Sequence, residues 1–390
     1  MSALFPIIRP SVTAADILAS AVSRRPRAGY DLVTELAGFC RAQDIFSLNS
    51  GIAAFYLVLL GLKELSPREE VILPAYTAGS LVVAVRKAGL KPVLCDISLE
   101  DFNADPASLL AAVNGNTLAA VAVHMFGIPM RDIAQLRQKL PPEVFLLEDC
   151  CQSMGARVED TACGCFGDIS FFSFNRGKNI STFGGGCICV NKKELAGSIQ
   201  KQINLYAQKR PGGFFLPLKM LIFLFATDPV LYGSAYNFIS KFKENAPPAD
   251  IPVSALSHYQ MKLGSRLIHT RQGDLLQRHR NGMYLLQGLE KSKSLILPEI
   301  GEKLFAVFNR LPVLCRNTQE LQKIRQRLRE AGFESSRMYE KPLHHMFDLG
   351  YPEDAFPASV TLAQHLLTLP VYPGLQLRLD DMIAAIGRGS

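Results

Sequence analysis

The chain has 390 residues, of which 48% are hydrophobic and 20% are charged, and its net charge is +7. This length can bury a large core and typically forms two domains, and the composition is that of a soluble globular protein. The mild positive charge suits small anionic ligands, but the basic residues are not spread as a nucleic-acid-binding surface requires. We therefore expect no nucleic-acid partner.

The cysteines and the N-terminus predict a cytoplasmic protein without a disulfide framework. The cysteines number nine, and Met1–Pro10 lacks the charged start and apolar core of a signal peptide. Cys163 and Cys165 could form half of a metal site, but ligand pairs usually have two or more residues between them and come with a second pair elsewhere, whereas one residue separates these cysteines. Small buried side chains are the favoured interpretation, and no metal is expected.

The region from residue 71 to residue 190 alternates short apolar runs with helical patterns. The pattern predicts strands at 71–73, 92–95, 118–123 and 144–147, and helices at 80–87, 106–114 and 131–140. Two further strands are expected at 170–174 and 186–190. Repeated strand–helix–strand units indicate an α/β fold with a mostly parallel sheet, whose ligands bind at the carboxyl ends of the strands. Asp149 and Gln152 lie at such an end.

The Pro-rich segment 244–252 is the expected domain boundary, with a large domain over 1–250 and a small α+β domain over 251–390. The small domain is predicted to contain one long helix over 254–289, strands at 306–308 and 311–314, and a helix over 321–331.

Residues 214–226 are unusually apolar, but Pro217 and Lys219 interrupt them and they are too short to span a bilayer. We expect a helix that covers the core or a dimer interface. A weak peripheral contact with a membrane is the alternative.

Lys178 follows a strand that carries serine and precedes the turn Gly184–Gly186. A lysine amine can form a Schiff base with an aldehyde, and a carboxylate such as Asp149 can keep a pyridine nitrogen protonated. This layout suits pyridoxal phosphate (PLP). The residues alone leave other roles open, because most lysines are solvated and Asp149 could also cap a helix. Gly51, before a helical run, could offer backbone N–H groups to a phosphate.

The chain resembles the DegT/DnrJ/EryC1/StrS family of PLP-dependent aminotransferases, which act on nucleotide-linked keto sugars. The resemblance is strong from about residue 50 to residue 190 and weak after that. The matching segments follow the order of the family: Ser50–Gly51, Glu70–Thr77, Lys91–Val93, Val123–Gly127, Glu148–Gln152 and Ser170–Ile180.

The resemblance implies a fold-type-I PLP transferase with a seven-stranded type of sheet, and it implies roles for individual residues. Lys178 would bind the cofactor aldehyde, and Asp149 would pair with the pyridinium nitrogen. Gln152 would lie by the 3-hydroxyl, and Ser173 would bind the phosphate together with Gly51.

Three departures from the family pattern concern the hold on the cofactor. Ile52 replaces a threonine, so the backbone groups of Ile52 and Ala53 would have to carry the phosphate. Ala78 replaces an aromatic residue that stacks on the cofactor ring, and Tyr76 lies two residues away. The Asn-x-Arg segment that a neighbouring subunit contributes matches poorly at 245–257.

By resemblance, Tyr339 and His344 are candidate substrate contacts, and each active site would lie at a homodimer interface. The expected reaction moves an amino group, with glutamate as the expected donor, onto a nucleotide-linked keto sugar for surface polysaccharide or secondary metabolite synthesis. Two alternatives stay open. One is a non-catalytic sensor or assembly protein of this fold, and the other is a PLP-dependent sugar dehydratase. Lys178 argues against the dehydratase, because that branch has histidine there.

Overall fold

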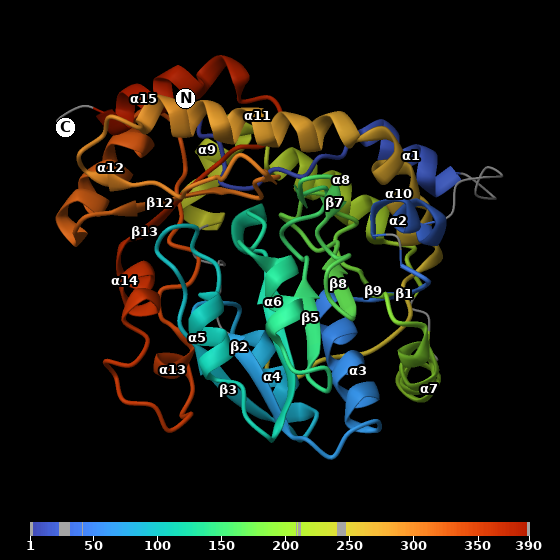
Figure 1. Cartoon of the computed structure of the whole chain (residues 1–390). Helices are drawn as coiled ribbons and strands as arrows, with labels where there is room; N and C mark the ends of the chain where they lie inside the picture. Colours follow the sequence, from blue (N-terminus) through green and yellow to red (C-terminus); the bar gives the residue numbers. More distant parts are fainter. Residues whose placement is uncertain are drawn as a thin grey trace.

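The computed structural model of the protein describes residues 3–22, 32–40, 42–207, 209, 212–239 and 247–387. Its centre is a seven-stranded sheet with helices around it and a smaller sheet beside it (Figure 1). The strands lie in the order β1 (Asp44–Leu48), β9 (Gly186–Val190), β8 (Ile169–Ser173), β5 (Phe145–Asp149), β4 (Thr117–Val123), β2 (Glu70–Pro74) and β3 (Lys91–Cys95). The six strands predicted between residues 71 and 190 are confirmed, and β1 adds an edge that the sequence did not predict.

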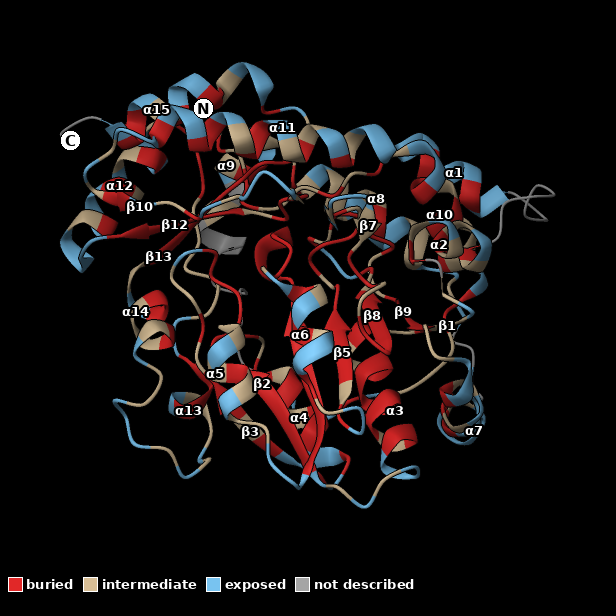
Figure 2. Ribbon diagram, in the orientation of Figure 1, coloured by how far each residue is buried: buried red, intermediate tan, exposed pale blue. Residues whose placement is uncertain are grey.

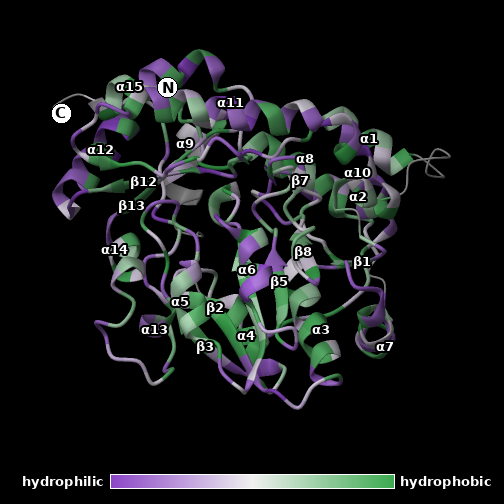
Figure 3. Cartoon of the chain, viewed as in Figure 1, coloured by the Kyte–Doolittle hydropathy of each residue, from purple (hydrophilic) through white to green (hydrophobic). Residues whose placement is uncertain are grey.

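All strands of this sheet run in one direction except β9, which is antiparallel to both of its neighbours. Parallel pairs need long crossover connections, and these place helices on both faces of a sheet. The strands β2, β4 and β9 are accordingly buried along their whole length (Figure 2). The strands in the middle of the sheet are also largely hydrophobic (Figure 3). The predicted α/β fold is confirmed.

Alternate residues of the strands pack against two different helix layers. Leu147 belongs to the hydrophobic cluster of α3 and α4, and Leu146 to that of α5 and α6. Side chains alternate along a strand, so Asp149 continues the face of Leu147 and Glu148 that of Leu146. The two neighbouring carboxylates therefore point in opposite directions. The four helices are α3 (Gly51–Lys63), α4 (Ser80–Lys87), α5 (Pro106–Ala111) and α6 (Ile133–Lys139).

The C-terminal part of the chain builds an antiparallel sheet of its own. Its strands are, in order, β10 (Leu295–Ile296), β12 (Leu311–Cys315) and β13 (Leu366–Leu369), and its helices are α12 (Thr318–Glu330), α14 (Pro357–His365) and α15 (Leu379–Gly387). A third sheet joins β11 (Leu304–Phe305) to the hairpin of β6 (Arg157–Val158) and β7 (Thr161–Ala162). The division into domains at residue 250 stays a prediction, and residues 244–246 of the predicted connector lie outside the described residues.

The pattern predicts one helix over 254–289, whereas the structure has two, α10 (His258–Thr270) and α11 (Gln272–Leu289). Arg271 separates them, with φ −111° and ψ 19°. Its guanidinium pairs with the carboxylate of Asp16, which also pairs with Arg266 at 2.9 Å. The break lets α10 pack on α1 (Ala14–Val22) while α11 packs on α15. A tertiary ion pair thus accompanies the end of a helix that sequence periodicity would continue.

The predicted strand at 306–308 is wrong, because the ladder there ends at Phe305. The Val307 N–H donates to the Gly127 carbonyl and the Asn309 N–H to the Phe126 carbonyl, both at 2.9 Å. Gly127 has φ +86°, and an added Cβ would lie 2.0 Å from the Val307 carbonyl oxygen. The segment 306–309 is therefore held as a loop against the turn that follows β4, and only glycine permits that approach.

The predicted helix over 106–114 begins correctly at Pro106 but ends at Ala111. Asn114 lies in a turn instead of the helix. Its N–H donates to the Thr117 hydroxyl at 2.9 Å, and its side chain donates to the Glu70 carboxylate at 2.7 Å.

The apolar segment 214–226 forms the helix α8, and the face that it turns outward is hydrophobic. Leu218, Ile222 and Phe225 are 56%, 59% and 65% exposed, whereas Met220 is buried. No described helix is long and apolar enough to cross a membrane. The remaining helices are α2 (Leu32–Cys40), α7 (Ala196–Tyr206), α8 (Leu216–Ala226), α9 (Pro229–Ile239) and α13 (Leu343–Met346).

Candidate active site

Three predicted site residues meet where two strands end and a helix begins. Asp149 is the last residue of β5, Ser173 the last of β8, and Gly51 the first of α3. A Cβ on Gly51 would lie 2.9 Å from the Ser173 Cβ and 3.0 Å from the Cys151 sulfur. Only glycine therefore allows the helix to start so close to the strand ends. Ligands of mostly parallel sheets bind at this edge.

The first turn of α3 presents backbone N–H groups at the same edge. The Ser50 hydroxyl caps the helix by accepting a hydrogen bond of 3.1 Å from the Ala53 N–H. The Ile52 N–H makes no hydrogen bond to any described residue. A free amide at a helix N-terminus is suited to an anion. Both amides are expected to hold a phosphate. The Ile52 N–H is free to donate to one, whereas the Ala53 N–H already donates to the Ser50 hydroxyl.

The turn that follows Asp149 carries the half-buried thiol of Cys151. The Cys151 N–H donates to the Asp149 Oδ1 at 2.9 Å. Burial raises the pKa of the Cys151 thiol well above its ordinary value, the negative charge of Asp149 raises it further, and the positive charge of Lys178 lowers it. The Asn179 side chain donates to the Gln152 carbonyl at 3.2 Å, so the loop that carries Lys178 borders the turn that follows Asp149.

The loop that carries Lys178 is held from both sides. The Asn309 side-chain amide donates to the Gly177 carbonyl at 2.5 Å, and the Asn179 amide donates to the Val307 carbonyl at 2.9 Å. These bonds fix the residues immediately before and after Lys178 to the loop 306–309. Support of this kind restricts the lysine backbone and so preorganises the position of its amine.

Gln152 lies in the turn after β5, and its side chain reaches the turn after β4. Its Oε1 accepts from the Phe126 N–H at 3.2 Å, and its Nε2 contacts the Met125 sulfur at 3.2 Å. The carbonyl of Gln152 accepts from the Asn179 side chain at 3.2 Å. Gln152 therefore connects the two turns with the lysine loop, and its role beside a cofactor hydroxyl stays a prediction.

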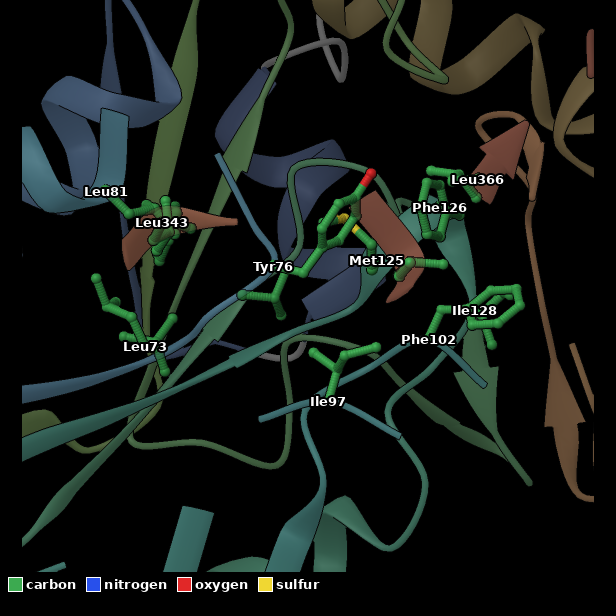
Figure 4. Packing of buried hydrophobic residues seen from close by; sticks show 14 of the residues in the cluster. Leu73, Tyr76, Leu81, Ile97, Phe102, Met125, Phe126, Ile128, Leu343 and Leu366 are labelled. Atoms are coloured by element: carbon green, nitrogen blue, oxygen red, sulfur yellow. The ribbon is translucent and has the colours of Figure 1, made fainter. Parts of the chain in front are cut away.

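Tyr76 and Tyr339 pair within the site. The Tyr76 hydroxyl donates to the Tyr339 carbonyl at 3.2 Å, and the two rings meet edge to face with centroids 5.6 Å apart. Tyr76 is buried in the main hydrophobic cluster, to which Met125 also belongs (Figure 4). Burial raises the pKa of Tyr339, and the nearby Asp149 raises it further. Ala78 is half-buried just before α4.

His344 contacts Glu353, His345 and Phe356, which are not among the predicted site residues. Its Nε2 is 3.4 Å from the Glu353 carbonyl, and its ring meets those of His345 and Phe356 at centroid distances of 4.2 and 5.2 Å. Within the described residues no hydrogen bond or ring contact joins it to Lys178 or Asp149. The structure does not bring it together with the other candidates, and its contact with substrate stays a prediction.

Glu148, the neighbour of Asp149, is fully buried and organises the backbone. One side of its carboxylate accepts a hydrogen bond of 2.9 Å from the His124 Nε2. The carboxylate also accepts from the backbone N–H groups of Gly164 at 2.8 Å, Phe166 at 2.7 Å and Gly167 at 2.6 Å. A buried carboxylate is stable when its oxygens are satisfied in this way.

His124, Glu148 and Cys150 offer ligand atoms that lie within 4.8 Å of one another. The His124 Nδ1, however, accepts from the Met130 N–H at 2.9 Å, so the second ring nitrogen is also engaged. Metal ligands need free lone pairs, and the histidine has none left. The hydrogen bonds explain this cluster without an ion.

The cysteines behave as free thiols in the structure. Cys163 acts electrostatically on His124, whereas the Cys165 thiol donates to the Cys40 carbonyl at 2.9 Å. Cys163 and Cys165 lie in the turn after the short strand β7. They therefore do not share a face as two alternate residues of one strand would.

The sequence assigns no role to Asn309, whose side-chain amide donates to the Gly177 carbonyl of the lysine loop, or to its neighbour Arg310. No local motif marks them, because their partners are far away in the chain. The one sequence feature that could have marked them is that Asn309 and Arg310 are polar residues between the apolar runs 306–308 and 311–314.

The model of the DegT/DnrJ/EryC1/StrS aminotransferase family matches residues 16–212. The pleiotropic regulatory protein of Geobacillus stearothermophilus is 25% identical over 358 residues, which cover 88% of this chain and 84% of that protein. The dTDP-3-amino-3,4,6-trideoxy-alpha-D-glucose transaminase of Streptomyces venezuelae is 26% identical over 365 residues, covering 90% and 84%.

Among solved structures, the PLP form of a putative sugar aminotransferase from Streptococcus pneumoniae superimposes with a TM-score of 0.76. The two chains are 20% identical, and the match covers 99% of this chain and 98% of the other. At this identity the likeness establishes the fold.

Proposed function

Since the chain belongs to the DegT/DnrJ/EryC1/StrS aminotransferase family, we propose that it is a PLP-dependent aminotransferase. It would transfer an amino group from glutamate to the keto group of a nucleotide-linked sugar, in the cytoplasm. The observation that carries this proposal is the hydrogen bond from the Asn179 side chain to the Gln152 carbonyl, which joins the loop of Lys178 to the turn after Asp149 at the edge of the sheet where ligands bind.

The residues at the site fit PLP. The space that a Cβ on Gly51 would fill lies between the start of α3 and the end of β8, with the Ser173 side chain beside it. The open Ile52 amide and the Ser173 hydroxyl would hold the phosphate. Asp149 would lie at the ring nitrogen, and Lys178 would hold the aldehyde.

When bound, PLP supplies an aldehyde that combines with amines and a ring that accepts electrons. Lys178 would release the aldehyde to the incoming amine and then move a proton at the substrate carbon. The buried Asp149 carboxylate would keep the proton on the ring nitrogen, because an opposite charge nearby favours the charged form. In total, an amino acid and a keto sugar become a keto acid and an amino sugar.

Asp149→Asn should lower kcat/KM with glutamate by roughly 10²- to 10³-fold, because a preorganised charge at the reacting system is lost. Asparagine keeps an oxygen that can accept from the Cys151 N–H, so the melting temperature should stay within a few degrees. Stopped-flow absorbance of the cofactor after mixing with glutamate measures the rate. A wild-type rate in this variant would rule out the role of Asp149.

The substrate is best identified by screening keto-sugar nucleotides against the protein loaded with pyridoxamine phosphate. Transfer of the amino group should restore visible absorbance and yield an amino sugar that mass spectrometry can detect. If no keto sugar reacts although glutamate converts the cofactor, the acceptor belongs to another class of carbonyl compound.

A non-catalytic sensor is a second candidate, favoured by Ile52, by Ala78 and by the regulatory name of one relative. A sensor would bind PLP, and its absorbance would not change when glutamate is added. A dehydratase is disfavoured by Lys178, since the resemblance places histidine there in that branch.

The outward face of α8, formed by Leu218, Ile222 and Phe225, is proposed as a contact with a second copy of the chain. The helix borders the lysine loop, since its Phe223 ring lies 6.0 Å from the Arg176 guanidinium. Burying such side chains contributes about 1.5–3 kcal/mol each. Sedimentation velocity should therefore show a dimer that Phe225→Glu weakens at least about tenfold.

Leu65→Glu is the matched control, because Leu65 is exposed but lies outside α8. If Phe225→Glu leaves the dimer intact and instead abolishes binding to anionic lipid vesicles, the helix contacts a membrane.

A further inference from the structure

The helix α12 carries a basic flank beside the face that it buries. Its apolar residues Leu321, Ile324 and Leu328 are buried where the helix packs on β12, α14 and α15. Residues that follow these by one position lie along the neighbouring flank, because an α-helix has 3.6 residues per turn. Arg325 and Arg329 occupy that flank, and α12 lies at the periphery of the molecule (Figure 1).

The basic flank lines a cavity of about 430 Å³. The N-terminal segment contributes Leu4 to its wall, α9 contributes Tyr236, and the segment after α12 contributes Phe333. The volume lies within the roughly 300–1,000 Å³ that is typical of small-molecule sites. None of the predicted cofactor or substrate residues is among the described residues that line it. The cavity is therefore separate from the candidate active site.

The positive charge of the two arginines is not neutralised by a neighbouring acid. Lys323, which also lines the cavity, pairs with Glu320 of the same helix at 2.9 Å. In contrast, no ion pair within the described part of the chain includes Arg325 or Arg329. Charges of one sign that gather in a concave surface raise the local concentration of ions of the opposite sign.

Glu334 is the acid in the wall of the cavity, and its carboxylate is engaged elsewhere. The carboxylate is buried, and its Oε2 accepts from the Ile7 N–H at 2.9 Å and from the Tyr232 hydroxyl at 2.8 Å. These bonds tie Glu334 to the N-terminal segment and to α9, and they stabilise its charge by donors of its own.

The spacing of the two arginines favours an anion between them. Arg325 and Arg329 are one helical turn apart, roughly 6 Å along the axis. Like charges at this spacing destabilise a helix, and a bound anion would remove that cost. The Arg329 guanidinium lies over the Tyr236 ring, 4.5 Å from its centroid. Stacking of this kind uses the flat face of the guanidinium and leaves the N–H groups in its plane available to a ligand.

The chemistry of the wall indicates which anion fits. The planar fork of arginine matches the oxygens of a phosphate group. Two forks one turn apart can each hold one phosphate of a diphosphate, whereas a single phosphate engages only one of them. The apolar side chains of Leu4 and Phe333 line another part of the cavity, which offers room for an organic group attached to the diphosphate.

We propose that this cavity is a binding site for a diphosphate group, which either inorganic pyrophosphate or a nucleoside diphosphate can supply. Arg325 and Arg329 each hold one of the two phosphates. The inference goes beyond the proposed function and does not depend on it, because no residue of the candidate active site takes part.

Isothermal titration calorimetry of the PLP-loaded protein with inorganic pyrophosphate tests the proposal. The titration is run at physiological salt, where surface charges are screened beyond about 8 Å. Arg325→Met and Arg329→Met should each weaken binding by roughly 10- to 100-fold, the loss typical of a charged hydrogen bond. Arg325 is half-buried and Arg329 is exposed, so the melting temperature of both variants should stay within a few degrees.

Lys291→Met is the matched control. Lys291 is exposed after α11 and does not line the cavity, and its replacement removes the same charge from the protein. Its affinity for pyrophosphate should stay within about twofold of wild type, because distant surface charges are screened.

Uridine diphosphate and malonate distinguish the possible ligands. Uridine diphosphate that binds at least about tenfold more tightly than pyrophosphate would support a nucleotide as the source, and equal affinity would support the diphosphate group alone. Either result should depend on the same two arginines. Malonate, a dicarboxylate, should bind at least about tenfold more weakly than pyrophosphate because it carries less charge.

Pyrophosphate affinity that stays unchanged in Arg325→Met and Arg329→Met would overturn the proposal, and so would an equal affinity for malonate. A wild-type protein that binds neither pyrophosphate nor uridine diphosphate would also overturn it. Failure of the proposed function looks different, since a protein inert toward glutamate would still bind diphosphate through these arginines.

Discussion

Lys178→Ala should abolish turnover, with a loss of about 10⁴-fold or more, because one amine serves both as the covalent attachment and as the base. The visible absorbance of the cofactor bound to the lysine, at roughly 400–430 nm, should vanish at the same time. Lys178 is half-buried, and the bonds that hold its loop are made by Gly177 and Asn179, so the variant should keep its fold. Steady-state kinetics, absorbance and thermal unfolding check these three expectations.

The matched control is Lys193→Ala, which removes an exposed lysine after β9. It should leave both absorbance and kcat unchanged. Retained turnover in Lys178→Ala would remove the lysine from the mechanism. Lost turnover with a normal spectrum would place the cofactor on a different amine.

Glu148→Ala should destabilise the protein by about 3–5 kcal/mol, the cost of deleting one partner from a buried charged network. Three backbone N–H groups and His124 would lose their acceptor in a site without solvent exposure. Glu148→Gln should cost less, because its amide oxygen still accepts while its NH₂ faces donors. Urea denaturation monitored by circular dichroism measures both values.

Glu143→Ala is the comparison for this prediction. Glu143 lies just before the same strand, and its side chain is 48% exposed in an ion pair with Arg68. Such surface pairs contribute little, so the change should stay within about 0.5 kcal/mol. If Glu148→Ala were as mild, the loop 164–167 would not depend on the carboxylate.

The predictions for Asp149 and Glu148 separate two neighbouring acids of one strand. Asp149 and Glu148 follow each other in β5, and alternation along the strand sends them to opposite faces. One faces Cys151 and the lysine loop, and the other supports the backbone. A loss of activity with normal stability is expected for the first, and a loss of stability for the second.

The sequence by itself determined the central sheet and the succession of strands and helices between residues 71 and 190, and it predicts the lysine and carboxylate of the candidate site. These follow from periodic apolar patterns and from motifs within single loops, both of which depend on near neighbours in the chain. Tertiary structure decided the rest. It ended the helix at Arg271 through Asp16 and held 306–309 as a loop against Gly127.

It also brought Asn309 to the lysine loop and Tyr339 to Tyr76. The physical reason is that each of these contacts joins segments far apart in sequence, and their partners exist only after the chain has closed around its core.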